Sequence, residues 1–295
     1  MFGTIIWRLR EAIDVFFGKK KTVALQSSTQ PIESKRTLSP EKFLEQNKEL
    51  AELINATSIE FCFSEFGETR TNAGGNHFAG NRLDPSLSTL RKFFPNAKYT
   101  VYSDFDLKIE GVRLRKIDKM PFENDGHPRY LYRIADYFKF RSLIESDADF
   151  VCVLDSDMFV ASSEIYRLVY LTQLFGACTA YNVRNLLKTD MEISLDTKSI
   201  VDLSNGYGHS FNQSPMTLRK NFDMGKKFYE VCCKWMIKEP SRASRVMWKA
   251  SQELGYSPYL LPQQFCVCTG QEGVGNEILL HVGHKSVAEY YQVNV

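Results

Sequence analysis

Two aspartates separated by a single residue stand directly after an apolar run. Residues 150–154 read FVCVL, and Asp155-Ser156-Asp157 follow at once. A continuous apolar run predicts a strand covered on both faces, and ligands of open α/β sheets bind outside the carboxyl ends of such strands. Two carboxylates this close repel each other unless a cation lies between them. We therefore predict that Asp155 and Asp157 bind magnesium or manganese and, through it, a phosphorylated ligand.

Two kinds of chemistry use an acidic pair after a strand. In one, the metal binds the diphosphate of a nucleotide sugar. The other resembles the haloacid-dehalogenase-like phosphatases, in which the first aspartate is a nucleophile. In those enzymes the motif lies near the start of the domain, and a small Thr or Val stands two residues after it. Here the pair lies in mid-chain and is followed by Met158-Phe159, which favours the first interpretation. A phosphatase with Asp155 as nucleophile stays the alternative.

The C-terminal third contains a second group of residues suited to a metal and a phosphate. A strand-like run over residues 278–280 ends in His281, and His284 and Lys285 lie just beyond it. Imidazole can bind manganese, and the lysine ammonium can offset the charge of a diphosphate. We expect His281 to complete the metal site, with His284 as its substitute, and Lys285 to contact the donor.

A helical pattern over residues 127–144 precedes the acidic strand. Arg133, Asp136 and Lys139 recur at intervals of three, so they share a helix face. An arginine, an aspartate and a lysine on one face can bind a phosphate or sugar hydroxyls, or can form ordinary surface salt bridges. The nearby acidic pair favours the first role.

The remaining pattern alternates strands with helices. This alternation predicts an α/β fold with a mainly parallel sheet flanked by helices. The expected strands cover 58–63, 99–102, 112–117 and 150–154, and the expected helices cover 86–94, 127–144, 222–237 and 245–254. A polar loop rich in glycine and asparagine, residues 67–82, lies between the first strand and the first of these helices.

Residues 135–157, ADYFKFRSLIESDADFVCVLDSD, resemble the helix–strand–DxD core of GT-A glycosyltransferases. The resemblance implies a single catalytic domain with a Rossmann-like, mixed and mainly parallel sheet. In that family an aspartate and a basic residue three positions on contact the donor sugar. Asp136 and Lys139 match those places, with lysine where arginine is usual. The resemblance also implies that Arg133 and Ser156 lie on the donor side.

Three later segments resemble the same group. GNEILLHVGHK, residues 275–285, is similar to the HxxGxxK ending of family 8 glycosyltransferases, in which the histidine completes the metal site, although the spacing is shorter here. SFNQSPMTLRK, residues 210–220, resembles an FNxGxM strand, with Asn212 matching and Ser214 in place of glycine. Residues 251–265 resemble a DQ helix followed by LPxxF, with Gln252 matching and Ser251 where aspartate is common.

The resemblance implies transfer of a sugar from a UDP- or GDP-linked donor to a hydroxyl of a glycan or glycoconjugate. Such an enzyme would be a metal-dependent hexosyl- or pentosyltransferase, with manganese expected in preference to magnesium. Asp155, Asp157 and Gln252 would be catalytic, and Asn212 would bind the donor. The serine at position 251 leaves a non-catalytic nucleotide-sugar-binding protein as a further alternative.

The composition is that of a soluble globular protein. Hydrophobic residues make up 43% of the chain and charged residues 24%, with a net charge of +2, so we expect no nucleic-acid partner. The seven cysteines are odd in number and several lie in apolar runs, which indicates reduced thiols. Cys266 and Cys268 form a CxC pair, but no second pair or nearby histidine completes a zinc set in the sequence, and we expect no structural zinc.

The N-terminal 45 residues differ from the rest. Residues 1–21 have apolar side chains at helical spacing and end in three lysines, and no stretch of the chain approaches the roughly 20 apolar residues of a membrane span. An amphipathic helix here would either lie on a membrane surface or pack on the domain. We expect a Ser-, Thr-, Gln- and Pro-rich linker over 22–45 and the catalytic domain over 46–295, in a cytoplasmic protein with peripheral membrane contact as the open alternative.

Overall fold

The computed structural model describes residues 38–69, 83–182 and 210–293. All of them belong to one compact unit, Arg36–Val295. The expected N-terminal helix over 1–21 and most of the glycine-rich loop, residues 70–82, lie outside the described residues. Among the residues described, no helix is long and apolar enough to cross a membrane.

The described chain begins with two short helices, α2 (Pro40–Gln46) and α3 (Lys48–Ala56). The hydroxyl of Ser39 caps α2 by accepting a hydrogen bond from the Lys42 N–H. Phe43 is buried, and its ring stacks on that of Tyr166 with centroids 6.0 Å apart. Helix α2 thus covers the last residues of the segment expected as a linker, 22–45, and residues 22–37 of that segment lie outside the described residues.

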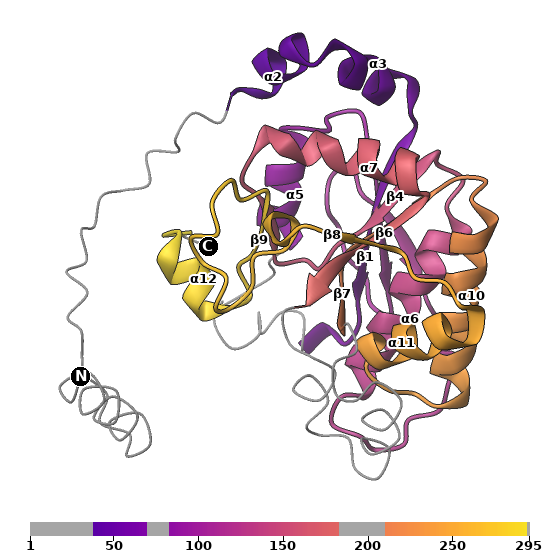
Figure 1. The fold of residues 1–295 in the computed structure, drawn as a ribbon. Coiled ribbons are helices and arrows are strands. Elements are labelled where there is room, and N and C mark those ends of the chain that lie inside the picture. Colours follow the sequence, from indigo (N-terminus) through magenta and orange to yellow (C-terminus); the bar gives the residue numbers. More distant parts are fainter. Residues whose placement is uncertain (1–37, 70–82, 183–209, 294–295) are drawn as a thin grey trace, which may run out of the picture. The chain divides into compact units, whose positions relative to one another are not determined.

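A seven-stranded sheet forms the centre of the unit (Figure 1), in the order β3-β2-β1-β4-β7-β6-β8. Strand β7 runs antiparallel to both of its neighbours, and the other pairs are parallel. The fold class expected from the sequence, a mixed and mainly parallel sheet flanked by helices, is confirmed. The strands are β1 Ile59–Glu65, β2 Lys98–Ser103, β3 Arg113–Lys116, β4 Phe150–Val153, β6 Ala177–Asn182, β7 Ser210–Arg219 and β8 Tyr259–Leu261.

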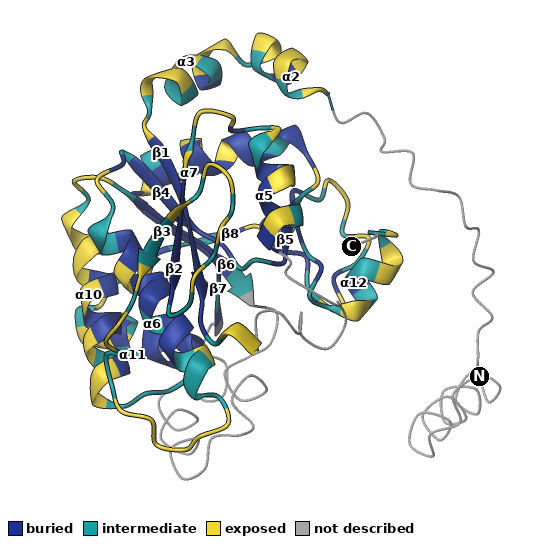
Figure 2. Cartoon of the chain, turned by 180° about the vertical axis from the view of Figure 1, so that it is seen from behind, coloured by how far each residue is buried: buried dark blue, intermediate teal, exposed yellow. Residues whose placement is uncertain are grey.

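The central strands are buried because helices cover both faces of the sheet. Every residue of β1 and of β4 is buried, which Figure 2 shows as a dark-blue centre. Alternate residues of β4 enter different clusters: Val151 and Val153 pack with α6, α10 and α11, whereas Phe150 and Cys152 pack with α5 and α7. These helices are α5 Leu83–Arg91, α6 Tyr130–Glu145, α7 Arg167–Phe175, α10 Asp223–Lys238 and α11 Ala243–Leu254.

Two helix boundaries differ from the sequence-based ones for local reasons. Helix α6 begins at Tyr130 and not at residue 127, because His127 precedes Pro128 and a residue before proline disfavours the helical region. Helix α5 spans Leu83–Arg91, so it begins and ends earlier than the expected 86–94. The residues that follow it form a turn ahead of Pro95.

A second, two-stranded sheet joins the acidic segment to the C-terminal region. Strand β5 (Met158–Val160) pairs antiparallel with β9 (Leu279–His281), so that Met158 lies opposite His281. A small apolar cluster holds this ribbon against the C-terminal helix α12 (Lys285–Tyr290); its buried members are Phe159, Val267, Leu280, Val282 and Val287. The pairing brings residues more than a hundred positions apart into direct contact.

Candidate metal and donor-binding site

The turn Asp155–Asp157 lies at the edge of the sheet where the parallel strands β1, β2 and β4 end. The N–H of Leu154 donates to the Cys62 carbonyl at 3.1 Å, which carries the β1–β4 pairing one residue past the strand. The N–H of Asp155 then donates to the hydroxyl of Ser214 on β7 at 2.7 Å. Ser214 is fully buried. These two hydrogen bonds fix the backbone from which the first carboxylate projects.

His281 faces both carboxylates through one ring nitrogen. Its Nε2 lies 3.2 Å from Asp157 Oδ1 and 3.9 Å from Asp155 Oδ2. The Val282 N–H donates to the Asp157 carbonyl at 2.9 Å, which extends the β5–β9 pairing beside the site. One ligand atom from each of the three side chains lies within 4.8 Å of the others. Two carboxylates and one imidazole fit a divalent cation that keeps further positions for water or phosphate oxygens.

Helix α6 contributes a buried lysine and a buried aspartate to the same place. Lys139 Nζ lies 2.5 Å from Asp155 Oδ1 and 3.5 Å from Asp136 Oδ1. Asp155 thus directs one oxygen to Lys139 and the other toward His281. Gln213 of β7 also hydrogen-bonds to the Asp136 carboxyl. The face shared by Asp136 and Lys139 therefore points toward Asp155.

Opposing effects of burial and charge act on the ionisable groups of α6. Burial alone would lower the pKa of Lys139, but the carboxylates of Asp155 and Asp136 raise it above its ordinary value. Burial raises the pKa of Asp136, although the lysine ammonium acts in the opposite direction. Lys139 is consequently a permanent cation that balances part of the negative charge of the site.

The same negative charge acts on His281. Burial alone would lower the pKa of this imidazole, but the Asp157 carboxylate and the Cys268 sulfur raise it well above its ordinary value. The same negative charge would therefore stabilise either a proton on His281 or a divalent cation at the carboxylates. The charge that holds the proton on His281 also attracts a metal ion to the carboxylates.

Two thiols lie against the other nitrogen of His281. Cys268 Sγ is 3.6 Å from His281 Nδ1 and 3.5 Å from Cys266 Sγ. The side-chain amide of Asn212 donates to both sulfurs, at 3.2 Å to Cys266 and 3.6 Å to Cys268. The hydrogen bond with Cys266 lowers the pKa of Cys268 against the effect of burial, and His281 lowers it further.

This arrangement corrects the sequence-based view of the two cysteines. We predicted that no nearby histidine completes a metal set with Cys266 and Cys268, and that prediction is wrong. The β5–β9 pairing brings His281 beside them, and the two sulfurs and the imidazole form a second group of potential metal ligands. The only signal in the sequence was the CxC spacing itself. In the sequence, Ser214 is only a departure from the glycine of the FNxGxM pattern, and nothing there indicates its hydrogen bond to Asp155.

Several predicted site residues lie elsewhere or at the margin. Arg133 pairs with Asp125 at 3.0 Å. Lys285 is exposed and lies 3.5 Å from Glu289 on its own helix. Gln252 is exposed on α11, and within the described residues no hydrogen bond or ion pair joins it to the two aspartates. Their assigned roles stay predictions that the geometry does not support directly.

The remaining two predicted residues lie at the edge of the site. His284 is near, with its ring edge-on to that of His281 at 4.6 Å between centroids, and its Nδ1 lies 2.9 Å from the Thr269 hydroxyl. Ser156 lies in the turn between the two aspartates and is partly exposed. Each residue therefore lies next to one of the three potential metal ligands, His284 beside His281 and Ser156 beside the two aspartates.

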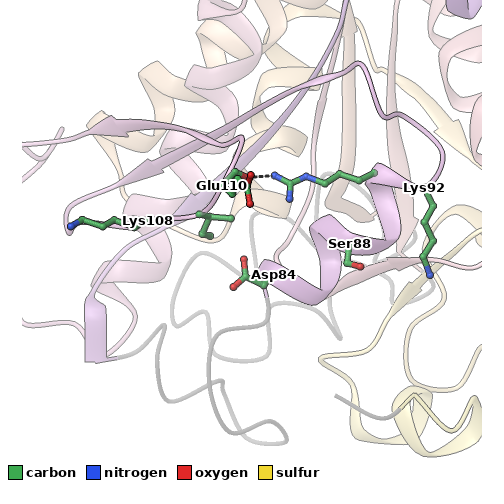
Figure 3. A pocket seen from close by; sticks show the side chains of 7 residues that line it. Asp84, Ser88, Lys92, Lys108 and Glu110 are labelled. Atoms are coloured by element: carbon green, nitrogen blue, oxygen red, sulfur yellow. Dashed lines mark hydrogen bonds between the residues drawn. The ribbon is translucent and has the colours of Figure 1, made fainter.

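A separate surface pocket of about 620 Å³ lies beside α5. Figure 3 shows Asp84 and Ser88 of α5, Lys92 just past the end of that helix, and Lys108 and Glu110 among the lining residues, with the Arg91 guanidinium donating to the Glu110 carbonyl. The lining carries charges of both signs. None of the residues gathered around His281 lines this pocket.

Similar solved structures include glycosyltransferases. A galactosyltransferase crystallised with donor and acceptor sugar analogues is 13% identical, and the match covers 75% of this chain and 86% of that one, with a TM-score of 0.46. Mouse xyloside xylosyltransferase 1 is also 13% identical, covering 76% of this chain and 96% of that one, with a TM-score of 0.48. GT-A glycosyltransferases, the family that the sequence resembles, are thus among the structural neighbours.

The neighbours also include enzymes that transfer a nucleotide. A 4-diphosphocytidyl-2C-methyl-D-erythritol synthase from Anaerococcus prevotii is 10% identical, and the match covers 71% of this chain and 88% of that one, with a TM-score of 0.41. No family model matches the chain, and no curated protein matches it by sequence. At these identities the similarity concerns the fold and not the reaction.

Proposed function

We propose that the protein is a metal-dependent glycosyltransferase that moves a sugar from a nucleoside diphosphate sugar to an acceptor hydroxyl. One observation carries the proposal: Asp155, Asp157 and His281 Nε2 converge at the carboxyl edge of a mainly parallel sheet. Ligands of open α/β sheets bind at that edge. A cation held there has open positions for the two phosphates of a nucleotide sugar.

Three side chains would hold the metal: Asp155 through Oδ2, Asp157 through Oδ1 and His281 through Nε2. When bound, the ion supplies Lewis-acid stabilisation of the departing diphosphate and a template for its orientation. Because one ligand is an imidazole nitrogen, the set favours manganese over magnesium, which prefers oxygen ligands alone.

The residues around the metal ligands would orient them and receive the sugar. Lys139 holds the second oxygen of Asp155, and Ser214 holds its backbone N–H, so the carboxylate keeps one orientation. Asp136 lies beside Lys139 and offers a carboxylate to sugar hydroxyls. We assign Asp136 and Lys139 to the donor sugar and Ser156 to the nucleotide side, with a UDP- or GDP-linked donor and a glycan or glycoconjugate acceptor.

The test is a screen of nucleotide sugars with manganese, with separate measurement of each product. Glycosyl transfer or donor hydrolysis releases a nucleoside diphosphate. Nucleotidyl transfer from the same donors would break the bond between the two phosphates and release a sugar phosphate. A phosphatase that uses Asp155 as nucleophile would leave the nucleotide sugars intact and would release inorganic phosphate from an added phosphomonoester such as p-nitrophenyl phosphate. We expect a nucleoside diphosphate, and we expect its release to stop when manganese is chelated. Donor binding without any released product would overturn the catalytic proposal and favour a nucleotide-sugar-binding protein.

We also propose a cytoplasmic location, with residues 1–21 making peripheral contact with a membrane surface. The support is the sequence pattern alone, apolar residues at helical spacing followed by Lys19, Lys20 and Lys21. Co-sedimentation with anionic liposomes, with and without residues 1–21, tests this. Equal sedimentation of the two proteins would end the membrane proposal.

A further inference from the structure

His281 lies between two groups of potential ligands that differ in chemistry. Its Nε2 faces the carboxylates, and its Nδ1 faces the sulfurs of Cys266 and Cys268. The two sulfurs and an imidazole nitrogen lie within 4.8 Å of one another. The proposed sugar transfer needs only the carboxylate side of the ring, so it leaves the thiol side without an assigned role.

The distances within the thiol group match those between ligands of a tetrahedral zinc ion. With Zn–S bonds of about 2.3 Å and Zn–N bonds of about 2.0–2.1 Å, neighbouring sulfurs are about 3.8 Å apart, and sulfur and nitrogen are about 3.6 Å apart. The observed separations are 3.5 Å between Cys266 Sγ and Cys268 Sγ and 3.6 Å between Cys268 Sγ and His281 Nδ1. A tetrahedral cation therefore fits with only small movements of the side chains.

The backbone holds both cysteines in place independently of any ligand. The N–H of Cys266 donates to the Gln263 carbonyl at 2.9 Å, and the N–H of Cys268 donates to the Gln271 side-chain oxygen at 2.8 Å. Between them, Val267 bridges to Leu280 of β9. Cys266 is buried, whereas Cys268 is partly exposed and gives an ion a path of entry.

Asn212 completes the surroundings. Its amide nitrogen lies 3.2 Å from Cys266 Sγ and 3.6 Å from Cys268 Sγ. Amide groups that donate to ligand sulfurs are typical of the outer shell of metal–thiolate sites, where they orient the ligands. Asn212, which the resemblance to GT-A glycosyltransferases assigned to the donor, thus contacts the thiols.

We propose that Cys266, Cys268 and His281 Nδ1 bind a thiophilic divalent cation, with zinc as the ion that fits best. Thiolate and imidazole ligands select such ions, whereas the neighbouring carboxylates suit manganese. Three protein ligands leave the fourth position of the tetrahedron open to water. The proposal does not depend on sugar transfer.

Sharing one imidazole couples the two sites. When Nδ1 binds zinc, a neutral ring carries its proton on Nε2, and that nitrogen then donates to Asp157 and no longer binds a metal. Zinc at the thiols should therefore weaken manganese at the carboxylates by about 10-fold or more, which is the scale seen when the support of a metal ligand is lost.

The test is a cadmium titration of the metal-free full chain, followed through thiolate-to-metal charge-transfer absorption in the ultraviolet. Manganese binding is measured in parallel by electron paramagnetic resonance. The double variant Cys266→Ser/Cys268→Ser should lose the cadmium band and keep manganese binding. Asp155→Asn/Asp157→Asn should show the opposite. Cys233→Ser, which removes a buried thiol of α10 that belongs to neither group of ligands, is the matched control and should keep both the cadmium band and manganese binding.

A measurement on the unaltered protein guards against variants that fail to fold. Alkylation of the cysteines, mapped by mass spectrometry, should be slowed at Cys268 by zinc and unaffected there by manganese. The proposal is overturned if the cadmium band survives in Cys266→Ser/Cys268→Ser, or if zinc leaves alkylation of Cys268 unchanged. Neither readout requires a nucleotide sugar, so an inactive transferase would leave the result intact.

Discussion

At the scale of single residues, Asp155 and His281 each contact two different partners, one through each of their two side-chain oxygens or ring nitrogens. Asp155 gives Oδ1 to Lys139 and turns Oδ2 toward His281. His281 gives Nε2 to the carboxylates and Nδ1 to the thiols. Asp157 Oδ1 lies 3.2 Å from His281 Nε2.

Replacing Asp157 by asparagine should abolish tight manganese binding. The change removes a negative charge and a strong oxygen ligand but keeps the shape of the side chain. We expect nucleoside diphosphate release to fall by more than about 100-fold, because loss of an outer-shell partner alone costs up to that much in metal affinity. Manganese binding and product release, measured on the same preparation, check this. A variant that retained full release would show that the metal assignment is wrong.

Replacing Lys139 by methionine should destabilise the metal-free protein. The lysine side chain is only 7% exposed and lies between two carboxylates, and removing one partner of a buried ion pair typically costs about 3–5 kcal/mol. Urea unfolding in the presence of a chelator measures the loss. The control Asp136→Asn/Lys139→Met removes a carboxylate as well and should recover part of it. A cost below about 1 kcal/mol for the single variant would contradict the buried-pair interpretation.

At the scale of elements, two pieces of backbone outside the predicted strand–turn motif position the ligands. The β5–β9 ribbon sets His281 opposite Met158, immediately after the acidic turn. Strand β7 lies antiparallel beside β4 and presents Ser214 to the Asp155 N–H. The same strand supplies Gln213 to Asp136 and Asn212 to the thiols. Three successive residues of β7 therefore contact the three parts of the site.

Replacing Ser214 by alanine should affect both stability and metal binding. The variant leaves the Asp155 N–H without its partner at 2.7 Å, and an unsatisfied buried group costs about 1–3 kcal/mol. With the turn less constrained, we expect manganese affinity to fall by about 10-fold. Unfolding curves and manganese titration give the two values.

Ser163→Ala is the matched control for that experiment. Its hydroxyl donates to the Leu38 carbonyl at 2.6 Å, and it is buried outside the site. It should lower stability without changing manganese affinity. Equal manganese affinities for Ser214→Ala and the unaltered protein would remove Ser214 from the positioning role.

At the scale of the whole described unit, the metal ligands come from distant parts of the chain. Asp155 and Asp157 follow β4 of the large sheet, while His281 belongs to the ribbon near the C-terminal helix α12. A cation that binds all three ties the ribbon to the sheet. Because unfolding separates the ligands, binding of the ion favours the folded state.

Manganese should therefore raise the thermal stability of the protein. At a concentration 100-fold above its dissociation constant, an ion that binds only the folded state adds about 2.7 kcal/mol, which corresponds to several degrees in melting temperature. Thermal unfolding with and without manganese measures the shift. Asp155→Asn/Asp157→Asn should show none, and an equal rise in that variant would place the stabilising ion elsewhere.

The amino-acid sequence by itself determined the strands β1 to β4, the helices α5, α6, α10 and α11, and the acidic edge. Burial on both faces requires the apolar run Phe150–Leu154, and helical periodicity places Asp136 and Lys139 on one face. These are local consequences of solvent exposure, so the pattern of residue types reveals them. The carboxyl-edge rule then places Asp155 and Asp157 where a ligand binds.

The sequence already indicated His281 as a ligand, but only the tertiary structure decided which other groups surround those aspartates. The pairing of two three-residue strands, β5 with β9, has no periodic signal of its own, because strands so short are specified by contacts with distant side chains. That pairing selected His281, left Lys285 and Gln252 without contacts to the acidic pair, and set Cys266 and Cys268 against the imidazole. Residue types show which groups can bind an ion, but long-range packing determines which of them lie close enough to share one.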